Sequence, residues 1–471
     1  MKILLTGVTG YIGKRLLPAL INDGHQVVCC VRDKKRFTPP ESMKDKIEVI
    51  ETDFLDRKSL KNIPADIDGA YYLMHSMSTS NDYESLELLS ARNFTEELKR
   101  TNVKHVIYLG GIINEKTLSK HLTSRKAVEV ELGKGSFNFT SLRAGIIIGS
   151  GSASFQIIMD LVEKLPVMIA PKWLNTKCQP IGIRDVISFL SGSFFNPVTY
   201  NKDFDIGGPD ILSYKEMLLG YARVRGLKRK IYIVPIMTPK LSSYWLYFVT
   251  AISFKLASAL VSSMKVEVVC RNNNINKLLN ITPTCYEEAL SRTLLKIEEN
   301  QVVSSWKDAW ISGRFNQNIS EFLIVPSHGC LIDTRNKPAA DIKKCADKIW
   351  RIGGNSGWYY ANWLWIIRGH IDKLYGGVGL RRGRRSPDEI SAGDAIDFWR
   401  VLYADKKEVR LLLYAEMKLP GEAWLEFKLN EGILIQTATF RPKGLLGRLY
   451  WYSVYPLHVI VFKGMLKNIA G

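Results

Sequence analysis

Short apolar runs alternate with amphipathic stretches over about the first 150 positions of the chain. The runs predict strands at 3–6, 26–31, 47–51, 69–74, 106–109, 139–142 and 146–148. Between them, apolar residues recur with helical spacing at 11–23 and 85–101. Strands that alternate with helices are typical of βαβ units, and right-handed crossovers then give a doubly wound parallel sheet. The pattern therefore predicts an α/β Rossmann fold.

The pattern changes after residue 155, and again near residue 329. Mixed helices, loops and a few strands up to about residue 300 predict a substrate lobe with a helical extension. Aperiodic residues 301–326 predict a connector. After it we expect a strand at 331–334, a helix at 341–351 and a further strand at 397–402. Alternating segments then predict an antiparallel meander, before an apolar helix at 445–469; the segments are 409–417, 423–429 and 433–440. We therefore predict a Rossmann domain at 1–300 and an α+β domain at 327–471.

A glycine-rich segment, TGVTGYIG, spans residues 6–13 between the first predicted strand and helix. Gly7 would permit the tight turn, Gly10 would let the backbone approach a pyrophosphate, and Gly13 would allow close packing of helix on strand. The start of the helix would then present free N–H groups and a positive dipole to the phosphates. A glycine turn without a ligand is the alternative, but the strand–loop–helix context favours a dinucleotide site.

The residues after the second and third strands bear on the choice of dinucleotide. Arg32 ends the second strand, with further basic residues at 34–36, and an arginine there accommodates the extra phosphate of NADP. Asp33 lies one position late for the acid that usually selects NAD. We therefore favour NADP(H), with NAD(H) as the alternative. Asp53 and Phe54 follow the third strand and would flank the adenine, unless Asp53 only caps a turn.

The charge composition favours one class of binding partner but does not identify a particular partner. The chain carries 65 Lys and Arg against 46 Asp and Glu, a formal charge of +19, which favours anionic partners or only a basic solvated surface. The basic run at 381–385 would grip a phosphate or a lipid headgroup, or is a solvated loop. It has no base-stacking pattern beside it, so we expect no nucleic acid. The aromatic-rich last third of the chain would line a hydrophobic ligand cavity or form an ordinary core.

The spacing of the cysteines and the apolar segments bear on the cellular compartment of the protein. Seven scattered cysteines form no C-x-x-C motif, so we predict neither a metal site nor a disulfide framework. The segment 244–264 is long and apolar, but Lys255 near its middle favours a buried or interfacial helix pair over a membrane span. The start of the chain does not read as a signal peptide. We expect a cytoplasmic protein, with peripheral membrane contact through 241–264 or the final helix as an alternative.

Several longer motifs extend the glycine loop into a family pattern. GAYYLMHSM (69–77), LRAGIIIGSGSASF (142–155), QPIGIRDV (179–186) and FDIGGPD (204–210) resemble the short-chain dehydrogenase/reductase superfamily, closest to its atypical NmrA-like and complex-I-39-kDa-like branch. RIGGNSGWYYANWLW and RPKGLLGRLYWYSVYPLH, further along, resemble a C-terminal domain of unknown function that is fused to such proteins in bacteria. The order of its elements is similar to the START-type helix-grip fold.

The resemblance implies roles for particular residues. The pyrophosphate would be lined by Thr6, Gly7, Thr9, Gly10, Tyr11, Ile12 and Gly13. Arg32 would meet the adenosine phosphate. Leu73, Met74 and His75 would pass beneath the adenosine ribose and the nicotinamide side. The residues near the nicotinamide would be Arg143, Gly145 and Ile146, together with their neighbour at 144.

The catalytic positions depart from the family pattern. The family usually carries a serine after the fifth strand and a Tyr-x-x-x-Lys on the next helix, whereas this chain has Gly110-Gly111 in place of the serine. The best alignment puts His121 at the tyrosine position and Arg125 at the lysine position. Arg125 keeps a positive charge for ribose or phosphate, and His121 can serve as general acid or base. Tyr108 and His75 are other candidate proton donors, and the alternative is that His121 is an ordinary histidine at an inactive site.

Two functions follow from this pattern. The first is an NADP(H)-dependent reductase of a hydrophobic, quinone-like or lipid-like molecule. The second is a redox sensor or assembly scaffold that binds NADP(H) without turnover. The sequence does not predict the substrate, the direction of reaction or the oligomeric state.

Overall fold

A computed structural model gives two compact units, Met1–Arg314 and Phe315–Gly471. The description below covers all residues except 35–36, 38, 40, 75–82, 115–119, 235–242, 244–257, 259–260, 262–263, 272–273, 299–324, 326–328, 381–383, 385 and 387. Nearly all of the predicted connector at 301–326 and most of the apolar segment 244–264 lie outside the described residues.

The N-terminal unit is built on a seven-stranded sheet with the order β11-β6-β5-β4-β1-β2-β3, and each strand is parallel to its neighbours. This order confirms the predicted doubly wound Rossmann fold, with β1 and β4 at the point where the chain changes direction across the sheet. The strands are β1 (Lys2–Leu5), β2 (Gln26–Val31), β3 (Ile47–Glu51), β4 (Gly69–Tyr72), β5 (His105–Gly111), β6 (Asn138–Ala144) and β11 (Lys202–Ile206).

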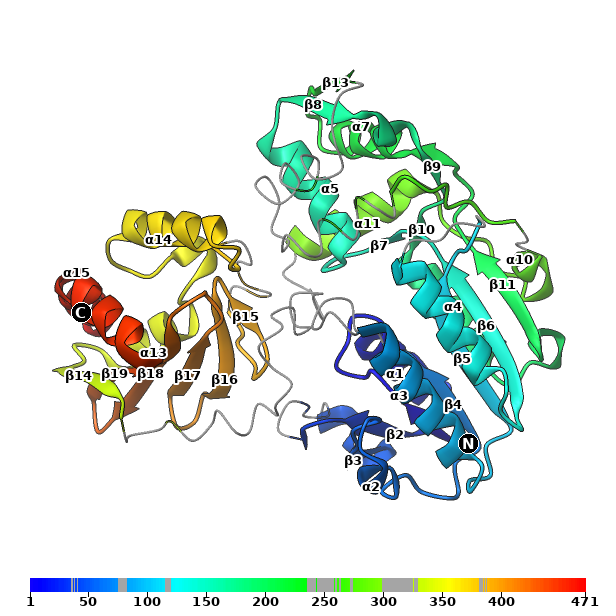
Figure 1. Cartoon of the computed structure of the whole chain (residues 1–471), viewed down its shortest axis with the longest axis horizontal. Coiled ribbons are helices and arrows are strands. Elements are labelled where there is room, and N and C mark those ends of the chain that lie inside the picture. Colours follow the sequence, from blue (N-terminus) through cyan, green and yellow to red (C-terminus); the bar gives the residue numbers. More distant parts are fainter. Residues whose placement is uncertain are drawn as a thin grey trace. The chain divides into compact units, whose positions relative to one another are not determined.

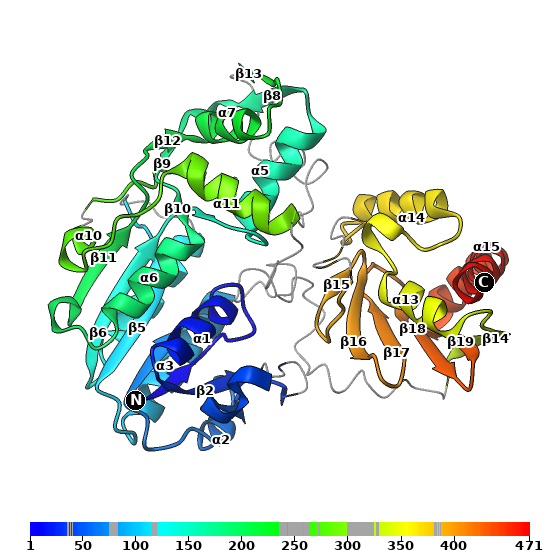
Figure 2. The same ribbon diagram turned by 180° about the vertical axis from the view of Figure 1, so that it is seen from behind.

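Helices cover both faces of this sheet, as Figures 1 and 2 show. On one face α1 (Gly13–Asn22) and α6 (Ile183–Ser193) pack their apolar residues against β1 and β2. On the other face, α3 (Tyr83–Leu98) and α4 (Lys120–Leu132) pack against the opposite side of the same strands. A short helix, α2 (Arg57–Leu60), contributes to the same core. Because both faces are covered, the strands are apolar on both sides, and this explains the unbroken apolar runs in the sequence.

A smaller lobe follows β6 and has its own core. Its members include α5, α7, α11 and three two-stranded sheets. The elements are β7 (Ile147–Ile148), α5 (Ala153–Lys164), β8 (Val167–Pro171), β9 (Lys177–Cys178), β10 (Ile181–Gly182), β12 (Leu212–Ser213), α7 (Tyr214–Val224), β13 (Lys230–Val234), α10 (Ile275–Leu278) and α11 (Tyr286–Glu298). This is the lobe with helical extension that the sequence predicts after residue 155.

The C-terminal unit is an α+β domain, as predicted. Its six-stranded antiparallel sheet has the order β14-β19-β18-β17-β16-β15. Among the described residues of this unit, helices α13, α14 and α15 contribute side chains to one core with a single face of this sheet. The elements are β14 (Leu331–Pro338), α13 (Ile342–Trp350), α14 (Asn362–Leu374), β15 (Ala395–Ile396), β16 (Trp399–Asp405), β17 (Arg410–Ala415), β18 (Gly421–Asn430), β19 (Ile433–Pro442) and α15 (Gly444–Ala470). Membership of the START-type helix-grip fold stays a prediction.

No helix within the described parts of the chain combines the length and apolar character needed to cross a bilayer.

Candidate functional site

The glycine loop joins the end of β1 to the start of α1, at the carboxyl edge of the parallel sheet. Gly7 has a φ of +67°, and a Cβ there would lie 2.6 Å from the carbonyl oxygen of Leu73, just beyond β4. A Cβ on Gly13 would lie 2.4 Å from the carbonyl oxygen of Gly7. Both contacts are with backbone, so neither position accepts a side chain unless the loop moves. The loop is thus folded tightly enough to bring its amides around a small anion.

The start of α1 lacks the usual protein cap. Ile12 is the N-cap residue and makes no side-chain capping hydrogen bond. The amides of Lys14, Arg15 and Leu16 already donate to carbonyl groups of Gly10 or Ile12. The first amides of a helix have no partner within the helix, and a phosphate bound at the helix start can accept hydrogen bonds from them. The geometry therefore fits a pyrophosphate at the position that the sequence predicts.

Thr6 fixes the loop to the neighbouring strand. It is fully buried, its Oγ1 donates to the carbonyl of Tyr71 at 3.0 Å, and the amide of Leu73 donates back to Oγ1 at 3.0 Å. The hydroxyl is therefore used within the protein, and Thr6 acts on the loop by holding β1 against β4. Leu73 is likewise buried. The loop residues Thr9, Gly10, Tyr11 and Ile12 are only partly buried.

Tyr11 connects the glycine loop with the segment after β7. The guanidinium of Arg15 lies 4.1 Å from the centre of the Tyr11 ring, and its Nη2 donates to the carbonyl of Ser150 at 2.6 Å. A Cβ on Gly149 would lie 2.3 Å from the Tyr11 hydroxyl, so that hydroxyl rests on the backbone of this segment. Burial raises the pKa of Tyr11 to about 12, so the phenol stays protonated at neutral pH. Sequence reasoning missed Arg15, which lies on α1 four residues after Tyr11.

The segment after β2 would meet the adenosine end, and Arg32 and Lys34 are both exposed there. Arg32 is exposed directly after β2, whereas the neighbouring Asp33 is buried at 3% exposure. Asp53 accepts a hydrogen bond from the amide of Leu55 at 3.0 Å, so its carboxylate caps its own turn. Phe54 is buried against other aromatic rings in the core beneath α3. The structure therefore places Arg32 in solvent and turns the Phe54 ring inward.

Arg125 packs against the glycine at the end of β5. It lies on α4, and a Cβ on Gly111 would come within 3.2 Å of its Nη1. The glycine at the end of β5 thus makes room for the guanidinium. The Nε of Arg125 is buried and has no hydrogen-bond partner among the described residues. A buried N–H without a partner is costly, and a bound phosphate, ribose or carbonyl oxygen would satisfy it.

The other proton-donor candidates differ in what the structure shows. His121 lies on α4, one turn before Arg125, and its side chain is outside the described residues. His75 lies outside the described residues altogether. Tyr108 is buried, its hydroxyl donates to the carbonyl of Arg125 at 3.3 Å, and burial raises its pKa well above the usual range. Tyr108 is therefore a poor proton donor, and the roles of His121 and His75 stay predictions.

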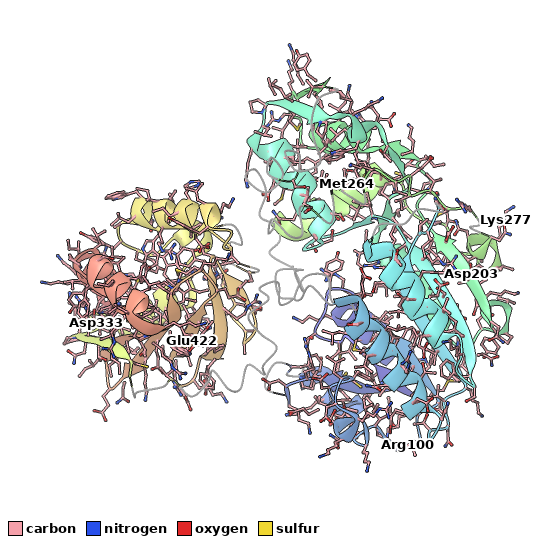
Figure 3. All side chains as sticks on the ribbon, viewed as in Figure 1. Arg100, Asp203, Met264, Lys277, Asp333 and Glu422 are labelled. Atoms are coloured by element: carbon pink, nitrogen blue, oxygen red, sulfur yellow. The ribbon has the colours of Figure 1, made fainter. Side chains whose placement is uncertain are left out.

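Arg143 is held by two carboxylates. Its Nη2 lies 2.6 Å from Glu129 on α4, and its Nη1 lies 2.6 Å from Asp203 on β11, which Figure 3 labels at that edge of the sheet. Burial opposes ionisation of Glu129, but the hydrogen bonds from Arg143 and Lys126 hold the pKa of Glu129 below its usual value. Arg143 is thus part of a structural ion-pair network, which the sequence did not reveal.

The segment after β6 supports the adjacent lobe. Ile146 accepts a hydrogen bond from the amide of Ile181 at 2.9 Å, and a Cβ on Gly145 would lie 2.8 Å from Val268. Met74, partly buried just beyond β4, packs against the core beneath α3 and α4. These positions lie at the carboxyl ends of the strands, where ligands bind in this fold.

Comparison with known protein families agrees with this geometry. Residues 7–158 match a family described as NAD(P)H-binding, and residues 330–465 match DUF2867, a family of unknown function. The match to the NAD(P)H-binding family covers the glycine loop and most of the parallel sheet of the N-terminal unit. The chain therefore joins an NAD(P)-binding domain to a separate DUF2867 domain, as the motifs predict.

Curated relatives of the NAD(P)-binding domain are distant. The chain is 23% identical over 227 residues to the chloroplastic divinyl chlorophyllide a 8-vinyl-reductase of Arabidopsis thaliana, covering 44% of this chain and 54% of the relative. It is 26% identical over 250 residues to the photosystem II assembly factor Ycf39 of Trieres chinensis, covering 52% and 75%. The chain thus spans about half the length of the plant reductase.

Solved structures share the fold of the NAD(P)-binding domain. The triphenylmethane reductase of Citrobacter sp., complexed with NADP(H), superposes with a TM-score of 0.51 at 15% identity, covering 62% of this chain and 100% of that one. A nucleoside-diphosphate-sugar epimerase from Staphylococcus aureus gives a TM-score of 0.51 at 16% identity, with coverages of 62% and 100%. At this identity the likeness concerns the fold alone. The roles of individual site residues stay predictions.

Proposed function

We propose that this chain is an NADP(H)-dependent reductase of a hydrophobic small molecule of the quinone or lipid class. The observation that carries the proposal is the buried Nε of Arg125 beside Gly111, which has no partner in the part of the chain that the structure describes and lies at the same sheet edge as the glycine loop. The names of relatives support it, since the matched proteins include divinyl chlorophyllide reductases and an isoflavone reductase homologue. A structural neighbour is a reductase complexed with NADP(H).

The residues present would divide the work as follows. The amides of the glycine loop and the start of α1 would hold the pyrophosphate, and the exposed Arg32 would pair with the adenosine phosphate that distinguishes NADP. Arg125 would donate to the ribose or to an oxygen that gains negative charge. His121 would give a proton to the reduced substrate. The reduced nicotinamide supplies hydride, and the protein orients it.

A second candidate function is a sensor or assembly scaffold that binds NADP(H) without turnover. Gly110-Gly111 replaces the family serine, and the hydroxyl of Tyr108 is tied to the α4 backbone, so the usual proton-transfer groups are missing at these positions. One matched relative is named as an assembly factor. Cofactor binding is common to both functions, and turnover separates them.

Turnover on a panel of quinones and enones tests the reductase. We expect the chain to oxidise NADPH with at least one of these acceptors, and His121→Ala to lower kcat by about hundredfold, within the range for loss of a general acid. The NADPH Kd of the variant should stay within about twofold, because the proton donor does not hold the cofactor. Absorbance at the nicotinamide band follows turnover, and fluorescence titration follows binding. Tight NADPH binding with no turnover on any acceptor would contradict the reductase proposal and favour the sensor or scaffold.

Arg125→Met tests whether the buried guanidinium of Arg125 contacts the cofactor. We expect the NADPH Kd to rise about tenfold, or about 1.4 kcal/mol, because the variant loses a charged donor from a buried site. Arg125→Lys should recover part of this loss by restoring the charge. Lys126→Met is the matched control, since it removes a neighbouring charge on α4 that pairs with Glu129. Unchanged affinity in Arg125→Met would place the guanidinium away from the cofactor.

A further inference from the structure

Helix α14 turns a regular apolar face to the solvent. Trp363 is 62% exposed and Leu374 is 72% exposed, although both are large hydrophobic residues. The exposed apolar set recurs at helical spacing and comprises Trp363, Ile366, Ile367, Ile371 and Leu374, followed by Tyr375. The opposite side of α14 is buried through Trp365, Gly369 and Asp372. Core packing therefore uses only one side of this helix.

The final helix α15 repeats this arrangement. Its buried side packs Trp451, Val461 and Phe462 into the core. Its other side exposes Leu445, Leu446, Leu449, Tyr452, Tyr455, Leu457 and Ile460, the first two at 74%. We call these exposed apolar residues of α14 and α15 together the apolar helix face. Exposed apolar residues gathered on one side of a helix in this way are typical of an interaction site in a folded protein.

The two helices are neighbours within the C-terminal unit. The ring of Trp365 on α14 lies 6.1 Å from that of Phe462 on α15. A Cβ on Gly464 would come within 2.3 Å of the ring of Tyr360, just before α14. Figures 1 and 2 show the two helices adjacent to each other on the unit. The apolar helix face is therefore carried by two packed elements.

The exposed charged residues of α14 and α15 are all basic. Of the ionisable residues in α14 and α15, Asp372 is the one carboxylate. It is buried and accepts hydrogen bonds from the amides of Gly379 at 2.8 Å and Lys418 at 2.6 Å, so it faces inward. The basic residues of the two helices are Arg368, Lys373, Arg448, Lys463 and Lys467. A second copy of the same face would bring like charges together, whereas an anionic surface would complement them.

We propose that the apolar helix face docks this chain on the surface of an anionic lipid bilayer. Leu and Ile side chains would enter the boundary between headgroups and acyl chains, and the lysines and arginines would reach the headgroups. The Trp and Tyr residues of the face are the types enriched at membrane interfaces. The helices would lie on the bilayer, since none among the described residues can cross it. This proposal is independent of the reductase proposal.

Sedimentation of the full chain with vesicles tests the docking. We expect it to pellet with phosphatidylcholine vesicles containing about 30% phosphatidylserine in about 0.05 M salt, and much less with pure phosphatidylcholine or in about 0.5 M salt. Leu445→Glu/Leu449→Glu should weaken this binding by at least about tenfold. Arg448→Gln/Lys463→Gln should weaken binding to the anionic vesicles by about tenfold.

Ile332→Glu is the matched control, because Ile332 is 51% exposed and lies on β14 with its side chain on the face of the sheet away from the helices. It should bind within about twofold of the parent chain. Circular dichroism and a cooperative thermal transition check that each variant folds. Failure of the parent chain to pellet, or equal binding by the leucine variant, would overturn the proposal. A dimer in light scattering that the leucine variant converts to monomer would overturn it in favour of self-association.

Discussion

Gly13→Ala is expected to weaken NADPH binding by at least about hundredfold, or about 2.7 kcal/mol. The added Cβ would lie 2.4 Å from the carbonyl oxygen of Gly7 and 2.8 Å from the Cα of Val8. Both are backbone atoms of the glycine loop, so the clash is relieved only if the loop and the start of α1 move apart. That movement would take the amides at the start of α1 out of line with the pyrophosphate.

Calorimetric titration with NADPH and with NADH measures the effect, and the parent chain should bind NADPH more tightly because Arg32 faces the solvent at the adenosine end. Gly226→Ala is the matched control. Its φ is +65° and no atom lies within 4 Å of the added Cβ, so it should cost about 1 kcal/mol of stability and leave the NADPH Kd within about twofold.

If Gly13→Ala does not fold, Gly10→Ala carries the test, because its added Cβ would meet only the carbonyl oxygen of Gly7, at 3.0 Å. A folded Gly13→Ala variant with the affinity of the parent chain would show that the loop does not cradle the cofactor.

Most elements of the fold could be predicted because local pattern and tertiary burial agree. β2 (Gln26–Val31) and β3 (Ile47–Glu51) match the predicted limits, since apolar runs end where charged residues begin. β15 (Ala395–Ile396) was missed, and the predicted strand at 397–402 begins late, at Trp399. The cause is Asp397, which adopts a φ of +51° and accepts a hydrogen bond from the indole of Trp358 at 2.9 Å. This partner is distant in sequence, so no local pattern shows the break.

The candidate site likewise has parts that the sequence predicts and parts that depend on long-range contacts. The position of the glycine loop follows from residues that are adjacent in the chain, so it could be predicted. The network around Arg143 needs Glu129 from α4 and Asp203 from β11, which only the fold brings together. The inward position of Phe54 and the packing of Arg125 on Gly111 depend on the same long-range contacts. The sequence therefore predicts the strand–loop–helix corner, but not the long-range contacts that fix the side chains around it.

The C-terminal unit holds the largest expected effect on stability. Arg400 and Glu416 have fully buried side chains, and Nη2 of Arg400 lies 3.1 Å from Oε1 of Glu416. A second amino group, Nη1, donates to the carbonyl of Gly393 at 2.7 Å. Arg400→Ala would leave the Glu416 carboxylate buried without this cation. We expect the free energy of unfolding of this unit to fall by about 3–5 kcal/mol.

Urea unfolding followed by tryptophan fluorescence measures this loss, since seven of the eleven tryptophans lie after residue 349. Arg410→Ala is the control: Arg410 pairs with Glu426 at 2.7 Å, but both side chains are partly exposed, so its removal should cost no more than about 1 kcal/mol. Arg400→Met/Glu416→Leu should recover most of the stability lost in Arg400→Ala, because the cost lies in the unpaired charge and not in the missing attraction. A double variant as unstable as Arg400→Ala would mean instead that the pair stabilises the sheet through the hydrogen bonds of Arg400 to Gly393 and its neighbours.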